Sequence, residues 1–101
     1  MGARSPLPKR LRAARLRAGI SQREAGVRAG IDELSAGPRI NQYEKGKHTP
    51  DYLTLSRLGE VLGVPAPYFY AEDDELARVI AGFARLPRAK RARILELLVE
   101  E

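Results

Sequence analysis

Ser-Gln-Arg-Glu-Ala-Gly-Val-Arg-Ala-Gly, residues 21–30, and Arg-Ile-Asn-Gln-Tyr-Glu-Lys-Gly-Lys, residues 39–47, are the two stretches that decide the fold of this chain. Ser21 and Glu24 have the Ser-x-x-Glu spacing of a helix capping box. Gly30 and Gly46 stand where a glycine commonly ends a helix. The sequence therefore predicts two short helices, and a glycine-containing turn between them.

Apolar residues at helical spacing predict further helices on both sides of this pair. The helix expected over residues 8–18 has Leu11, Ala14 and Ala18 on its buried face, with Arg10 outside that face. The second helix of the pair is expected to start between Ser35 and Pro38. No strand pattern or internal repeat is found, so we expect an all-α chain. The other expected helices are 8–18, 51–62, 65–70, 72–85 and 87–99.

This pattern divides the chain into three parts. Residues 1–6 read as a flexible basic arm. Residues 7–71 hold five helices, which is close to the smallest unit that can bury its own core. Residues 72–101 form a helical hairpin whose first turn is acidic, as suits the positive end of a helix.

Composition limits what the chain can do. It has 101 residues and no cysteine, which excludes disulfides, zinc fingers and thiol chemistry. No run of about 20 apolar residues is present, so we expect no membrane span. The net charge is +5, and the basic residues are concentrated in the first half. This asymmetry favours a polyanionic partner, although a solubilising surface charge explains it equally well.

Residues 7–70 resemble the helix-turn-helix domain of the Cro and phage-repressor type, which is found in bacterial transcriptional regulators. The resemblance implies a five-helix, lambda-repressor-like domain with a two-helix C-terminal extension. Two departures stand out: the turn before the second helix of the pair is about four residues longer than usual, and Ala25-Gly26 replaces a Leu-Ala type pair. The matching residues are Leu11, Arg15, 19–22, Ala29-Gly30, Ile40, 43–46, Pro50, Leu55, Leu58 and 62–64.

The resemblance implies double-stranded DNA as the partner and a role for particular side chains. Base reading is expected from Arg39, Asn41 and Gln42, because Arg pairs with guanine and Asn or Gln with adenine in the major groove. The alternative is that these are merely exposed polar residues. Arg15 and Glu44 correspond to a partly buried ion pair that orients the reading helix. Phosphate contacts are expected from Gln22, Arg23, Lys45 and Lys47.

We therefore expect a transcriptional regulator, a repressor, located in the cytoplasm and associated with the nucleoid when bound to DNA. The rival interpretation is a protein-binding adaptor or antitoxin-like module with the same fold. We expect no enzyme activity, cofactor, metal or small-molecule ligand, because the lone His48 has no partner for catalysis or metal binding. The operator, the regulated genes and the sign of regulation stay open.

The C-terminal hairpin carries more apolar residues than a short tail needs. A domain of this kind reads few base pairs, so useful affinity usually takes two copies. We expect a homodimer, although the hairpin could instead fold back as core of its own monomer. The residues expected at the dimer interface are Leu76, Ile80, Phe83, Leu95 and Leu98.

Overall fold

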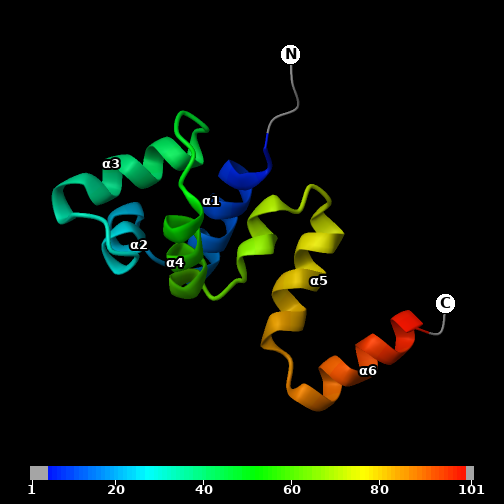
Figure 1. Cartoon of the computed structure of the whole chain (residues 1–101). Coiled ribbons are helices and arrows are strands. Elements are labelled where there is room, and N and C mark those ends of the chain that lie inside the picture. The colour runs from blue at the N-terminus through cyan, green and yellow to red at the C-terminus, as the bar shows by residue number, and fades with distance from the viewer. Residues whose placement is uncertain (1–4, 100–101) are drawn as a thin grey trace.

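The computed structural model describes residues 5–99, and within them the chain is entirely helical (Figure 1). The expected all-α class is confirmed. The predicted basic arm falls mostly on residues 1–4, which lie outside the described residues. The helices are α1 (Leu7–Ala18), α2 (Gln22–Arg28), α3 (Glu33–Glu44), α4 (Tyr52–Leu62), the 3-10 helix η1 (Ala66–Tyr70), α5 (Asp74–Arg85) and α6 (Arg88–Val99).

Side-chain caps and left-handed glycines fix the helix ends. The Ser21 hydroxyl accepts a hydrogen bond from the Glu24 N–H at 3.0 Å, as predicted. The Glu24 carboxylate, however, pairs with Arg28. Asp51 caps α4 by accepting from the Thr54 N–H at 2.8 Å. Gly63 ends α4 with a φ of 75°, a conformation that glycine adopts without strain.

The hydrophobic core lies between α1, α2, α3, α4 and η1, and Ala81 of α5 adds to it. Its largest fully buried side chains are Leu11, Ile40, Leu55, Leu58 and Phe69. The predicted apolar faces of α3 and α4 supply most of them. Ala18, which we expected in the core, is exposed. Helix α1 instead buries Leu7, about one turn before Leu11. None of the helices within residues 5–99 is long and apolar enough to cross a membrane.

Arg10 is buried, contrary to the expectation that it lies outside the packed face of α1. Its guanidinium donates to the Ala71 carbonyl at 2.8 Å and the Glu72 carbonyl at 3.2 Å, and its Nη1 lies 2.9 Å from Asp74 Oδ1. These partners satisfy the buried charge. Arg10 therefore joins α1 to the start of α5, a contact between distant segments that helical periodicity does not reveal.

Asp74, at the start of α5, contacts both Lys9 and Arg10. Hydrogen bonds from these two cations hold the pKa of the Asp74 carboxyl below its ordinary value of 3.8. A carboxyl whose pKa is lower in the folded chain stabilises the fold above that ordinary value. The contribution is lost as the pH falls through the folded-state pKa, so this contact weakens only in acid.

The start of α3 is the main correction to the sequence prediction. The helix begins at Glu33, not between Ser35 and Pro38, and Asp32 caps it by accepting from the Leu34 N–H at 3.1 Å. Pro38 therefore lies inside the helix. The residues expected to lengthen the preceding turn form an additional helical turn, since one turn takes about 3.6 residues.

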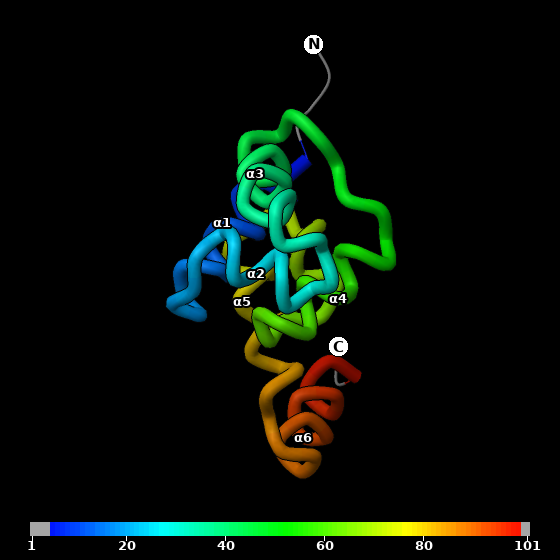
Figure 2. The backbone as a smooth tube through the Cα atoms, turned by 90° about the vertical axis from the view of Figure 1, so that its left-hand side faces the viewer, coloured from blue at the N-terminus to red at the C-terminus, as the bar shows by residue number. Residues whose placement is uncertain are grey.

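The C-terminal hairpin is not one unit. Helix α5 packs on the domain through Ala77 and Ala81, which are buried, and it contacts η1. None of the residues of α6 is buried. In two perpendicular views α6 lies at the opposite end of the molecule from α3 (Figures 1 and 2). The structure thus attaches α5 to the five-helix domain and leaves α6 apart from it.

Helices α2 and α3 pack closely because residue 26 is glycine. A Cβ atom built on Gly26 would lie 2.7 Å from the Ala36 Cβ and 3.0 Å from the Ala36 Cα and carbonyl oxygen. Both residues are buried. The small pair therefore brings the two helix backbones together, which explains why Ala25-Gly26 stands where related domains have larger residues.

Gly26→Ala should destabilise the fold even though alanine favours helix. Overpacking typically costs about 1–3 kcal/mol, against about 1 kcal/mol gained from helix propensity. The added Ala36→Gly change should recover part of the loss. Gly82→Ala is the matched control in a helix, because a Cβ there meets nothing within 4 Å, and it should stabilise slightly. Urea unfolding measures all variants; a neutral Gly26→Ala would contradict the close contact.

Candidate nucleic-acid interface

Helix α3 lies along the outer edge of the helical bundle (Figure 1). Its inner face consists of Ala36, Ile40 and Tyr43, all buried. Because each residue of an α-helix turns by about 100°, the side opposite these three can be located. That outward stripe holds Leu34, Pro38, Asn41 and Lys45. The stripe is a continuous surface along the length of α3, available to a partner.

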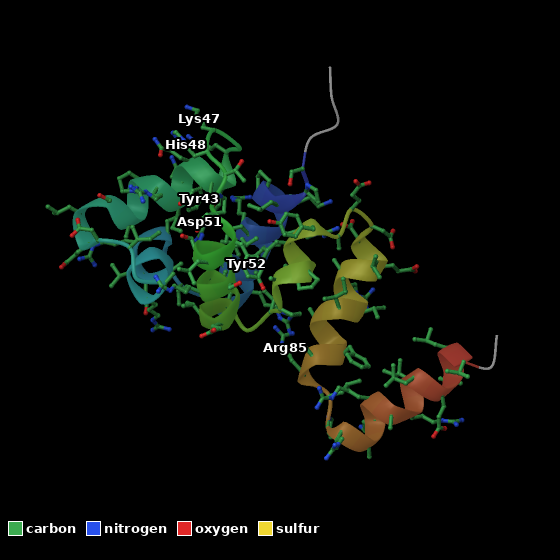
Figure 3. The ribbon with its side chains drawn as sticks, in the orientation of Figure 1. Tyr43, Lys47, His48, Asp51, Tyr52 and Arg85 are labelled. Atoms are coloured by element: carbon green, nitrogen blue, oxygen red, sulfur yellow. The ribbon has the colours of Figure 1, made fainter. Side chains whose placement is uncertain are left out.

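A tight chain reversal places basic groups at the C-terminal end of α3. Gly46 has a φ of 74°, and the Lys47 N–H donates to the Gln42 carbonyl at 2.9 Å, which is a Schellman-type ending. Lys45 and Lys47 are exposed there. Lys47 and His48 lie on the outer side of the loop, whereas Tyr43 lies within the bundle (Figure 3). This end of α3 therefore presents positive charge outward.

An ion pair ties α1 to the end of α3. Arg15 Nε donates to Glu44 Oε2 at 2.6 Å and its Nη2 donates to Glu44 Oε1 at 3.0 Å. A third guanidinium nitrogen donates to the Ile20 carbonyl at 3.1 Å. The side chains are only 11% and 3% exposed, and the hydrogen bond to Glu44 raises the pKa of Arg15. Such a bidentate pair fixes both distance and orientation.

Gln22 connects this ion pair to the outward stripe. Its Nε2 donates to Glu44 Oε1 at 3.1 Å and to Asn41 Oδ1 at 3.2 Å. The carboxylate of Glu44 is therefore shared between α1 and α2. Asn41 takes part in this contact through its amide oxygen, and its NH₂ group is not used in it. The four residues join three helices, and nothing in the sequence around Gln22 signals the link.

The sequence-predicted site residues fall into three groups. Arg15, Glu44, Gln22 and Asn41 come together in the network just described. Arg39, Lys45 and Lys47 are exposed, and Gln42 is half-buried on the flank of the stripe. Arg23 pairs with Glu33, which joins α2 to the first turn of α3. Sequence analysis missed that pair because residue 33 was expected in a loop.

Within residues 5–99 no group of three or more His, Cys, Asp or Glu residues could hold a metal ion. His48 is exposed in the loop after α3. The fold brings polar groups together around α3 and, separately, where Lys9 and Arg10 of α1 meet Asp74 at the start of α5.

Comparison with known proteins agrees with this architecture. Residues 11–69 match the helix-turn-helix family. Among solved structures, the crystal structure of transcriptional regulator BswR is 40% identical over 94% of each chain, with a TM-score of 0.88. A search of curated proteins gave no match. The chain belongs to the helix-turn-helix family of DNA-binding transcriptional regulators, and the recognised family and fold class are confirmed.

Arg15→Met should destabilise the fold strongly. Removing one member of a buried pair leaves the other charge unpaired, at about 3–5 kcal/mol. Arg12→Met is the matched control, because Arg12 lies on the same helix, is exposed and loses the same charge. Thermal unfolding followed by circular dichroism compares the two variants. Equal melting temperatures would show that the Arg15–Glu44 pair contributes nothing to stability.

Proposed function

We propose that this helix-turn-helix regulator is a sequence-specific repressor that reads the major groove of double-stranded DNA with α3. One observation carries the proposal: α3 is held at the outer edge of the bundle by the Arg15–Glu44 pair, with exposed basic side chains at its C-terminal end. A major groove about 12 Å wide admits one α-helix. The similarity to BswR, a transcriptional regulator that is 40% identical to this chain, supports the same role.

Base reading is assigned to three residues of α3. Asn41 lies in the outward stripe with its amide oxygen already bonded to Gln22, so its NH₂ group is the part that would donate to a base. Gln42 lies on the flank of that stripe, about 40° round the helix from Pro38, and the exposed Arg39 lies about 60° beyond Gln42. An Asn or Gln side chain suits adenine and an Arg side chain suits guanine, so we expect a site that contains both bases.

Phosphate contacts are assigned to residues at both edges of α3. Lys45 and Lys47 are exposed beyond its C-terminal end. Gln22, which begins α2, reaches a phosphate by giving up Asn41 or Glu44, because these two side chains take both hydrogens of its Nε2. Arg23 belongs to this set as well, although it must then share its guanidinium with Glu33. Such contacts fix the register of the protein on the duplex but do not select sequence. A protein that binds DNA in this way acts in the cytoplasm, on the nucleoid.

We further propose that two copies bind together through the C-terminal helices. Helix α5 uses Ala77 and Ala81 against its own domain, which leaves Leu76, Ile80 and Phe83 on a separate face. Leu76 and Ile80 line an apolar groove with Tyr52 and Tyr70. In α6, Leu95 and Leu98 are 52% and 65% exposed. Apolar side chains exposed on both helices support an interface, because large exposed apolar patches mark protein–protein contact sites.

Base reading is tested by alanine variants on a duplex selected from a random pool. Arg39→Ala or Gln42→Ala should weaken binding by about 1–3 kcal/mol and relax the preference at one or two positions. Lys47→Ala should weaken all duplexes alike and reduce the salt dependence. Fluorescence anisotropy at several salt concentrations measures both effects.

The same titration separates DNA binding from the adaptor alternative. A protein that contacts several phosphates loses affinity steeply as salt rises. An adaptor would show little binding to any duplex at any salt concentration. If affinity and sequence preference are unchanged in both the Arg39 and Gln42 variants, α3 is not the reader.

Phe83→Asp should convert a dimer into a monomer by placing a charge in the interface. The full chain should sediment as a dimer and protect two half-sites about 34 Å apart. Ala84→Asp is the control, because it adds the same charge at an exposed neighbour on α5, and it should remain dimeric. A wild-type chain that sediments as a monomer at micromolar concentration would refute the proposed interface.

A further inference from the structure

Leu34 is an apolar side chain with no place in the core. It lies in the first turn of α3 and is 88% exposed, more than any other large apolar side chain described. Leucine favours helix, but it gains nothing from contact with water. Single exposed leucines are common on protein surfaces, so exposure alone does not assign a role to Leu34. Its position on α3 provides the second observation.

Leu34 lies at the N-terminal end of the outward stripe. With about 100° of turn per residue, Leu34, Pro38, Asn41 and Lys45 fall within about 60° of one another. Leu34 and Pro38 are both exposed, and Gly37 lies beside them on the side of α3 that faces Arg23 of α2. The N-terminal half of the stripe is thus apolar and its C-terminal half polar and basic. Leu34, Gly37 and Pro38 have no side-chain group that could donate a hydrogen bond to a base.

The acidic groups next to Leu34 are already engaged. Asp32 accepts from the Leu34 N–H at 3.1 Å as the helix cap, and Glu33 pairs with Arg23. Their charges are therefore partly offset where α3 begins. Arg39, Lys45 and Lys47 then give the remainder of α3 and its ending a positive charge. A polyanion, rather than an apolar protein surface alone, matches this combination.

From this arrangement, which rests on the proposed function, we infer that Leu34 is a specificity-determining residue that contacts the C5-methyl group of thymine in the major groove. The thymine methyl is the apolar group on the major-groove edges of the four bases. Seven residues separate Leu34 from Asn41, or about 10 Å along the helix. That length corresponds to about three base pairs at 3.4 Å each. The methyl read by Leu34 should therefore lie about three base pairs from the base read by Asn41.

The test removes the methyl group without changing any hydrogen bond. The full-length protein selects a duplex from a random pool, and each thymidine of that duplex is then replaced singly by deoxyuridine. At one or two positions the replacement should weaken wild-type binding about fourfold, the amount expected for one buried methyl group. In Leu34→Ala the same replacements should have no effect. Leu34→Ala should fold normally, because the side chain is exposed.

Leu53→Ala is the control, since Leu53 is also exposed, at 56%, but lies on α4. It should keep the wild-type response to deoxyuridine. The inference is overturned if no thymidine responds in the wild type, or if Leu34→Ala responds as the wild type does. If either result is found but Arg39→Ala and Gln42→Ala still weaken binding, the proposed function stands and only the role of Leu34 is overturned. Failure to select any duplex would overturn both.

Discussion

The bidentate pair between Arg15 and Glu44 is the interaction on which the rest of the structure depends. It joins the last turn of α1 to the last residue of α3, and the two side chains are only 11% and 3% exposed. Gln22 then links the same carboxylate to Asn41. The orientation of α3 is therefore set by hydrogen bonds of fixed geometry as well as by apolar packing, and that orientation decides which side chains face outward.

Close packing of α2 against α3 provides the second constraint. Gly26 and Ala36 allow their backbones to approach, and the pair between Arg23 and Glu33 adds a contact at the first turn of α3. This first turn lengthens the outward surface of α3 beyond the start that the sequence predicts, between Ser35 and Pro38. The fold thus lengthens α3 without a longer loop, and Leu34 lies in the added turn.

Much of the fold follows from the sequence because it depends on local signals. Ser21 and Asp51 cap helices, and Leu55, Leu58 and Leu62 mark a buried face by their spacing. The predicted start of α3 was wrong because Ser35 and Pro38 fit a helix start by local rules, whereas in the structure the helix begins one turn earlier with Asp32 as its cap. Arg10 was misplaced because its partners, around residues 71–74, are distant in the chain. Periodicity describes one helix at a time and contains no information about such contacts.

The central claim is that the hydrogen-bonded network presents α3 to DNA. Amide chemical shifts of the ¹⁵N-labelled protein, recorded as the selected duplex is added, test it most directly. Large shift changes should be confined to residues 22–23 and to residues 34–47, at the end of the molecule opposite α6. Changes that cluster in α5 and α6 while α3 stays unaffected would contradict the account.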